Sequence, residues 1–403
     1  MSTSLLYHGF GIRGYFHVHS KFQKGQILFQ IKHDYWKLRC PDCKSRDFIK
    51  KGTIKRRFKA LPIGKKEVLI ELPVQRIECL SCQKVKQVKL DFAHAKCNYT
   101  HSFERYAIDL CRLLPISDVA RLLKVSWGTI KDIEKKYLKK HFDKPTLKEL
   151  KRIAIDEIYL GKKTKYLTLV MDLVTGAVVY IGDGKSADAL KPFWRKLKCA
   201  KASIEAVAMD MGRAYIKAVK DNLPGVPIVF DHFHVIKLYN EKLTELRRDL
   251  QREAEGADKD VLKGTRWLLL KSSKKLNTHN DECNQLKNAL KLNEPLAMAY
   301  YLKDDLGQIW KQNDKIEADF LLWEWIKKAS SSGVKMLIKF SKTLLKYSDE
   351  ILAYYDFDKM SSGPMEGTNN KIKTLQKRAY GYRDMEFFKL KVKSLHKTKY
   401  ALI

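Results

Sequence analysis

The amino-acid sequence predicts a multidomain α+β protein. Two small N-terminal modules precede an α/β domain, and an all-α insertion interrupts that domain. Three observations predict this organisation: two C-x-x-C pairs near the N-terminus, a change to alternating strand and helix patterns at Lys151, and a long helical pattern after residue 235. The expected domains are 1–35, 36–92, 93–148, 149–235 together with 361–403, and 236–360.

The composition indicates a folded protein with a polyanionic partner. The chain has 403 residues, and a hydrophobic share of 45% excludes disorder as its main state. Its 79 Lys and Arg against 46 Asp and Glu give a net charge of +33, of which the first 150 residues carry +18. A surface charged only for solubility is the alternative. The sequence has neither an apolar run of ~18–20 residues nor a signal-peptide pattern, so we expect a soluble protein without a membrane partner.

Two cysteine pairs, Cys40-Pro-Asp-Cys43 and Cys79-Leu-Ser-Cys82, predict a structural zinc site. Each pair can place two thiolates on one tetrahedral ion, and 35 residues separate the pairs. Short alternating segments in that gap indicate a small β-sheet that is too thin for its own core and that a metal would close. We therefore expect a zinc ribbon, with four unrelated buried thiols as the alternative.

The remaining cysteines and two nearby histidines are weaker candidates for metal binding. His94, Cys97 and His101 follow the ribbon closely, although ordinary core or surface roles are the simpler expectation for them. Three further cysteines stand in apolar or helical contexts and are expected in the core: Cys111, Cys199 and Cys283.

Residues 116–133 have the pattern of a helix-turn-helix. Val119, Ala120 and Leu123 mark one face of a short helix, and the small Ala120 permits a close crossing by a second helix. Ser126 is a good N-cap for that second helix. An unrelated helical hairpin is the alternative. The residues expected to contact DNA from this motif are Lys124, Ser126, Trp127, Thr129 and Lys131.

From Lys151 onward the pattern is three strands followed by alternating helices and strands, which is the order of an RNase H-like fold. In that order the first and fourth strands are neighbours, so Asp156 on the first and Asp210 at the end of the fourth come together. Two such carboxylates suit hard divalent cations. A lone Asp at a strand end is usually structural, but the pair at these two places favours a metal site.

A third carboxylate, Glu366, lies beyond the helical residues 236–360. Gly363-Pro364 is a typical helix start, which places Glu366 in the first turn with Asn370 and Lys373 on the same face. The carboxylate could approach the metals while Asn370 and Lys373 approach DNA phosphates. The alternative for Glu366 is a simple interaction with the helix dipole.

Together these motifs resemble the ISL3 family of bacterial DDE transposases. The resemblance also rests on the sequences IDE, MDM, FDHFHVIK, GPMEGTNNKIK and RAYGYRD, and it covers nearly the whole chain. It implies that Asp156, Asp210 and Glu366 are the catalytic DDE triad. It also implies a supporting role for Asp231 and His234, which match a C/D-x-x-H motif of related enzymes that carry helical insertions.

Further DNA contacts are expected from the C-terminal residues and the insertion. Arg378 and Arg383 lie in a basic tail whose lysines would face solvent or phosphate. Relatives with such insertions can bring a Trp to the DNA end, although helix packing is the simpler expectation for Trp323 and Trp325.

The resemblance implies a transposase that binds the terminal inverted repeats of its own element, cuts at the element ends and joins them to target DNA. The implied cofactors are two Mg²⁺ or Mn²⁺ ions and a structural Zn²⁺. The implied partners are double-stranded DNA and further copies of the chain in a synaptic complex, in the bacterial cytoplasm. Two alternatives stay open: a DNA-binding regulator with an inactive RNase H-like domain, and a structure-selective nuclease.

Overall fold

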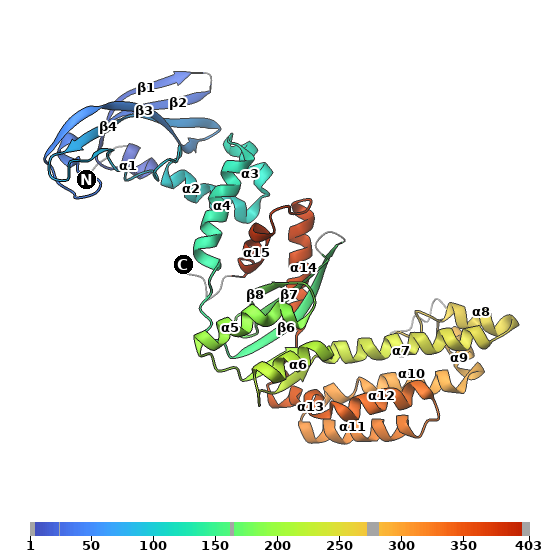
Figure 1. Ribbon diagram of the computed structural model, residues 1–403. Helices are drawn as coiled ribbons and strands as arrows, with labels where there is room; N and C mark the ends of the chain where they lie inside the picture. The colour runs from blue at the N-terminus through green and yellow to red at the C-terminus, as the bar shows by residue number, and fades with distance from the viewer. Residues whose placement is uncertain (1–4, 24, 162–164, 272–281, 397–403) are drawn as a thin grey trace. The chain divides into compact units, whose positions relative to one another are not determined.

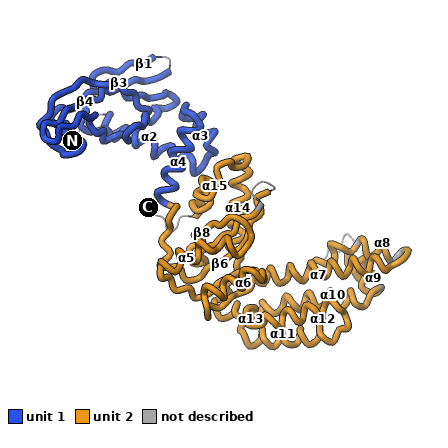
Figure 2. Tube along the Cα trace, viewed as in Figure 1, with its two compact units in different colours: residues 1–141 blue, residues 142–403 orange. Residues whose placement is uncertain are grey.

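The computed structural model describes residues 5–23, 25–161, 165–271 and 282–396 (Figure 1). The chain forms two compact units, Met1–His141 and Phe142–Ile403 (Figure 2). No helix within the described ranges is both long and apolar enough to cross a lipid bilayer.

The first unit begins with a five-stranded sheet of order β1-β2-β4-β3, with β5 paired to β4. Phe58, Ile70 and Leu72 are fully buried in its core. Residues 1–35, which the sequence predicted as a separate segment, supply β1 and β2, and β2 pairs in parallel with β4. The elements are α1 (Leu5–Phe10), β1 (Tyr15–Gln23), β2 (Gln26–His33), η1 (Tyr35–Lys37), β3 (Phe48–Ile63), β4 (Lys66–Cys79) and β5 (Val85–Gln87).

Three helices complete the first unit: α2 (His101–Leu113), α3 (Ile116–Leu123) and α4 (Trp127–Phe142). The helix-turn-helix pattern is confirmed in detail. Lys124 ends α3 in the left-handed conformation, with φ of +51°. Ser126 Oγ accepts a hydrogen bond from the Thr129 amide at 3.1 Å and so caps α4. Ala120 and Ile130 are buried where the helices meet, so the small side chain does permit close packing.

The second unit is built on a sheet of order β10-β9-β6-β7-β8. β6 runs antiparallel to β7 and parallel to β9, so the first and fourth strands are neighbours, as the sequence predicted. The elements of this part are β6 (Arg152–Gly161), β7 (Lys165–Asp172), β8 (Ala177–Asp183), η2 (Ala187–Leu190), α5 (Lys191–Ala200), β9 (Ala206–Met209), α6 (Arg213–Asn222) and β10 (Ile228–Phe230).

Helices cover both faces of this sheet (Figure 1). One face packs on α5 and α6. The other packs on α14 (Gly363–Arg378) and α15 (Met385–Lys393). Ala154, Ile158 and Ala208 belong to the core beneath α14 and α15. Because side chains alternate along a strand, the residues at even-numbered positions of β6 face these helices.

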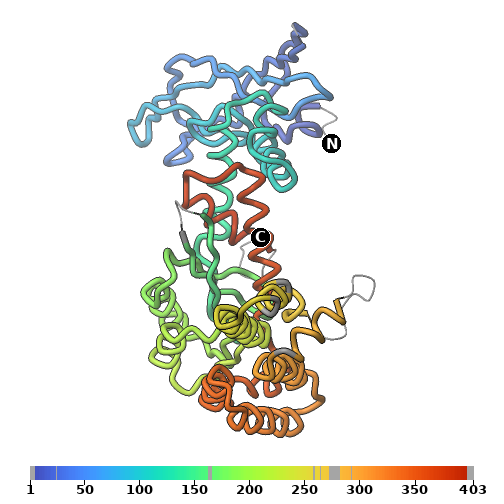
Figure 3. Tube along the Cα trace, turned by 90° about the vertical axis from the view of Figure 1, so that its right-hand side faces the viewer, coloured from blue at the N-terminus to red at the C-terminus, as the bar shows by residue number. Residues whose placement is uncertain are grey.

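Between β10 and α14 the described residues are helical almost throughout. The longest helix, α7, packs against α10 and α12, and Figure 3 shows these helices lying side by side. Residues 282–306 form two helices rather than one, because Asn293 caps a new helix that has Pro295 in its first turn. The helices are α7 (His232–Glu253), α8 (Gly256–Gly264), α9 (Glu282–Leu292), α10 (Glu294–Leu306), η4 (Ile309–Lys311), α11 (Lys315–Ser330), α12 (Lys335–Lys346) and α13 (Ser348–Asp356).

Candidate active site and metal centre

Asp156 and Asp210 lie at the same edge of the second sheet. β6 and β9 pair in parallel up to Ile155 opposite Met209, so the two aspartates occupy the next position on neighbouring strands. By strand alternation both carboxylates belong to the face that α14 covers. Asp210 Oδ1 accepts a hydrogen bond from the Gly212 amide at 3.0 Å, which fixes this carboxylate at the turn before α6.

The Asp156 carboxylate is held by two hydrogen bonds. Its Oδ1 accepts from the Glu157 amide at 2.7 Å, and its Oδ2 accepts from Asn369 Nδ2 at 2.8 Å. Burial raises the pKa of Asp156, and the nearby Asp210 adds to the rise, while the two hydrogen bonds and His234 oppose it. A partly buried carboxylate pair of this kind is suited to binding a divalent cation.

Helix α14 runs alongside β6 and brings Asn369 to the site. Gln376, seven residues further on, donates to the Leu160 carbonyl at 2.9 Å and anchors the helix a second time. Glu366 precedes Asn369 by three residues and therefore shares its helix face, one turn nearer the N-terminus. Glu366, Asn370 and Lys373 are exposed. The structure brings Asp156 and Asp210 together beneath α14. The carboxylate oxygens of Asp156, Asp210 and Glu366 do not all lie within 4.8 Å of one another.

Asp231 connects α7 with the segment that precedes α14. One carboxylate oxygen caps α7 by accepting the Phe233 amide at 2.9 Å, and the other accepts a buried hydrogen bond from Ser362 Oγ. His234, in the first turn of the same helix, interacts with Asp156. The C/D-x-x-H motif thus positions both α7 and the start of α14.

On the opposite face of the sheet, Glu157 joins a buried polar cluster. Thr168 is the cross-strand partner of Glu157, and its Oγ1 lies 2.9 Å from the Tyr215 hydroxyl. Tyr215 also interacts with Glu157. Burial raises the pKa of Glu157. Strand alternation places this carboxylate on the face opposite Asp156, yet the charges of Asp210 and Asp156 still add to the rise of its pKa.

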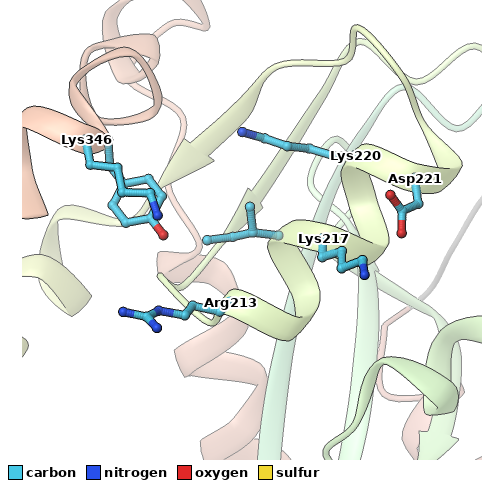
Figure 4. A pocket seen from close by; sticks show the side chains of 7 residues that line it. Arg213, Lys217, Lys220, Asp221 and Lys346 are labelled. Carbon is cyan, nitrogen blue, oxygen red and sulfur yellow. The ribbon is translucent and has the colours of Figure 1, made fainter.

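A basic recess of about 470 Å³ lies between α6 and α12 (Figure 4). Arg213 enters it only three residues after Asp210, and Lys220, seven residues further along α6, pairs with Glu350 at 3.0 Å. Lys346 stacks on the Tyr347 ring at 5.2 Å on the other side. The recess is lined by Arg213, Ile216, Lys217, Lys220, Asp221, Lys346 and Tyr347.

The four predicted cysteine ligands converge in the first unit. Sγ of Cys40 lies 3.6 Å from that of Cys82, and Sγ of Cys43 lies 3.4 Å from that of Cys79. Tetrahedral zinc with Zn–S bonds of about 2.3 Å requires sulfur atoms about 3.8 Å apart. The Cys43 amide lowers the pKa of Cys40 to about 6, and the Cys82 amide lowers that of Cys79. In the absence of an ion, the neighbouring Cys79 thiol raises the pKa of Cys43, and burial raises that of Cys82 to about 12. The donor set and spacing therefore fit a structural Zn²⁺.

Three family models match the chain. Residues 36–82 match the zinc-finger of transposase IS204/IS1001/IS1096/IS1165, residues 88–138 match the helix-turn-helix domain of transposase family ISL3, and residues 153–392 match the ISL3 transposase domain. The chain belongs to the ISL3 transposase family. It is a multidomain α+β transposase with a zinc ribbon that holds a structural Zn²⁺, a DNA-binding helix-turn-helix and a catalytic domain for DNA cleavage and strand transfer.

Individual relatives agree with this family. The ISL3 chain is 30% identical over 359 residues to the transposase for insertion sequence element IS1001 of Bordetella parapertussis, covering 88% of both chains. It is 24% identical over 373 residues to the transposase for IS1557 of Mycobacterium tuberculosis, covering 86% of this chain and 82% of that one. Among solved structures, the chain is similar to a Drosophila P element transposase strand transfer complex. The match covers 72% of this chain and 90% of that chain, with 12% sequence identity and a TM-score of 0.36.

The predicted DNA contacts of the ISL3 transposase lie on its surface. Trp127 is half exposed on α4, with Lys131 Nζ 5.5 Å from its ring centre. The Ser126 and Thr129 hydroxyls are 2.9 Å apart and form the cap of α4, so their first role is to start this helix. Lys124, at the turn, and Arg378 and Arg383, toward the C-terminus, are exposed as well.

Several predictions about single residues need correction. Cys199 is exposed rather than in the core, and Cys283 is only partly buried, whereas Cys111 is buried. Trp325 packs in the helical core and donates to the Leu302 carbonyl at 2.7 Å. Trp323, for which core packing was also expected, is half exposed, because it stands on the opposite side of α11.

The sequence did not single out Asn369, Ser362 or Arg213. The helix spacing could have indicated Asn369, because the residue three positions after Glu366 lies on the same helix face, as does the residue four positions after it. Ser362 and Arg213 gave no comparable signal, since their partners and surroundings come from distant parts of the chain.

Proposed function

We propose that residues 149–235 and 361–403 form an RNase H-like DDE catalytic domain and that residues 236–360 are an all-α insertion into it. The observation that carries this proposal is the pair Asp156 and Asp210 on neighbouring parallel strands, facing the helix that bears Glu366. The strand order, with three antiparallel strands followed by two parallel ones, also supports it.

In this proposal Asp156, Asp210 and Glu366 hold two Mg²⁺ or Mn²⁺ ions. Such ions polarise the scissile phosphate and stabilise both the attacking and the leaving oxygen of an in-line displacement. Asn369 orients Asp156 through the hydrogen bond to its Oδ2. Glu366 completes the set from the first turn of α14, where it is free to turn toward the aspartates.

Asp231 and His234 support this arrangement from α7. The bond between Asp231 and Ser362 ties the start of α7 to the segment that begins α14, and so it helps to set the position of Glu366. His234 favours the charged form of Asp156. A charged carboxylate is the form that binds a metal ion.

The DNA contacts follow from the distribution of positive charge. The zinc ribbon and helix-turn-helix would bind the terminal inverted repeats, with Lys124, Trp127 and Lys131 on the DNA side of α4. Backbone phosphates near the cleavage point would lie along Asn370 and Lys373 of α14, toward Arg378 and Arg383, and along the basic recess of α6. Joining two element ends requires two bound copies, so we propose a homo-oligomeric synaptic complex.

The test is cleavage and joining of labelled element ends in Mg²⁺ or Mn²⁺. Asp156→Asn, Asp210→Asn and Glu366→Gln should each abolish both reactions while end binding persists. Asp188→Asn is the matched control, because this aspartate is exposed and forms an ion pair with the exposed Lys191 across one helical turn. Cleavage that survives Asp210→Asn would disprove the triad.

The two rival functions predict different outcomes. A DNA-binding regulator would bind element ends and cut none of them in either metal. A structure-selective nuclease would cut branched DNA of any sequence and would not join element ends to a target. The intact acids at all three triad positions favour the transposase over the regulator.

A further inference from the structure

A cluster of two histidines and a glutamate lies between the zinc ribbon and the helix-turn-helix. His94 Nε2 is 3.2 Å from Glu104 Oε2, and His101 Nδ1 is 3.9 Å from the same oxygen. The two imidazole rings meet edge to face with their centres 4.2 Å apart. All three candidate ligand atoms lie within 4.8 Å of one another.

These distances fit a common metal ion. Zinc binds imidazole nitrogen and carboxylate oxygen at about 2.0–2.2 Å, so neighbouring ligand atoms of a tetrahedral site stand about 3.4 Å apart. Two histidines and one carboxylate would leave a fourth position for water.

The surroundings leave the proposed ligand atoms available. Lys136 Nζ lies 3.3 Å from the other carboxylate oxygen of Glu104, Oε1, and so orients the group with Oε2 toward the histidines. Both histidine side chains are 40–48% exposed, so an ion can reach them from solvent. Lys136 is the cation that faces Glu104, and its charge weakens but does not block a divalent ion at Oε2.

The cluster also has a clear place in the fold. His94 belongs to the loop that leaves the ribbon, whereas His101 and Glu104 form the first turn of α2. The loop returns to the ribbon at Lys59 of β3, whose amide donates to the Asn98 carbonyl at 2.8 Å and whose carbonyl accepts from the Thr100 amide at 2.9 Å. An ion bound here would connect the loop directly to α2.

We propose that His94, His101 and Glu104 form a second transition-metal site, distinct from the four-cysteine site, with Zn²⁺ as its ion. It ties the ribbon to the first helix of the DNA-binding module. The proposal is independent of the catalytic triad.

The test is a Co²⁺ titration of the metal-free full-length protein that carries Asp156→Asn, Asp210→Asn and Glu366→Gln, so that the proposed catalytic carboxylates take up no ion. Co²⁺ bound by thiolates absorbs in the near ultraviolet, whereas Co²⁺ bound by imidazole and carboxylate does not. This triad variant should take up two equivalents, only one of them with the thiolate band. In the same background, the double variant His94→Gln, His101→Gln should keep the thiolate equivalent and lose the other. His19→Gln, which changes an exposed histidine on β1, is the matched control and should keep both.

Two results would overturn the proposal. One is a single equivalent in the triad variant, which would mean that the three side chains form only an ion-pair network. The other is a second equivalent that persists in the double variant. Circular dichroism and the retained thiolate band show in the same samples that the first unit is folded, so misfolding cannot imitate the expected loss.

Discussion

Replacing Asn369 by alanine is the sharpest test of how the candidate active site is held. Asn369 Nδ2 donates to Asp156 Oδ2 at 2.8 Å, and no other described side chain is recorded as a donor to that oxygen. Asn370, the next residue, is exposed and lies about 100° further around α14. The two asparagines therefore form a matched pair, of which only one orients the carboxylate.

A hydrogen bond to a charged group is worth about 1.5–3 kcal/mol. If this energy serves to hold Asp156 in its reactive orientation, its loss lowers the cleavage rate by about 10–150-fold. Asn369→Ala should also raise the pKa of Asp156 further, because the lost bond favours the carboxylate. The acid limb of the pH–rate profile should therefore move to higher pH.

The assay is single-turnover cleavage of a labelled element end, measured across pH with saturating protein. Asn369→Ala should slow cleavage and shift the acid limb, with end binding unchanged. Asn370→Ala should weaken DNA binding in a salt-dependent way and leave the saturated rate near that of the wild type. Equal effects of the two variants on rate and pH profile would refute the assignment of Asn369 as the positioning residue.

Three further predictions concern stability. Cys79→Ser should abolish zinc binding and the thermal transition of the first unit but not that of the second, whereas Cys199→Ser, at an exposed thiol, should leave both transitions unchanged. Ser362→Ala removes a buried hydrogen-bond donor to the aspartate that caps α7. It should lower the free energy of unfolding by about 1–3 kcal/mol, which corresponds to about 2–4 °C of Tm per kcal/mol. Ser361→Ala should lower it less. Equal losses would contradict that reasoning. Burial lowers the pKa of Lys303 from 10.5 to about 8. Between pH 8 and pH 10.5 the unfolded chain therefore holds a proton on Lys303 that the folded chain does not, and the free energy of unfolding should rise with pH across that range. Denaturant titrations should show this rise, on the order of 3 kcal/mol, in the wild type relative to Lys303→Met, and parallel pH curves would argue against it.

The parts of the structure that the sequence predicted best are those with local or repeated signals. The cysteine spacing, the capped helix at Ser126 and the strands bearing Asp156 and Asp210 depend on patterns within a few residues, and strand order follows from alternation of helices and strands. The break between α9 and α10 also had a local signal, since Asn293 is followed by Pro295.

The rest depends on contacts between distant residues. The parallel pairing of β2 with β4 aligns Phe29 with Ile70, and nothing in residues 1–35 alone indicates that partner. The choice between Asn369 and Asn370 requires the rotation of α14 about its axis. That rotation is fixed by packing against the sheet, through the buried Met365 and Ile372.

The bond between Asn369 and Asp156 spans 213 residues of sequence, and this separation orders events during synthesis. At about 5–20 residues per second, the ribosome needs about 10–40 s to extend the chain from one partner to the other. The zinc ribbon and helix-turn-helix, which end before either residue, can fold within that interval. A nascent or truncated chain would therefore occupy element ends while lacking the helix that completes the carboxylate site, and such products would compete with the full-length enzyme for its own DNA.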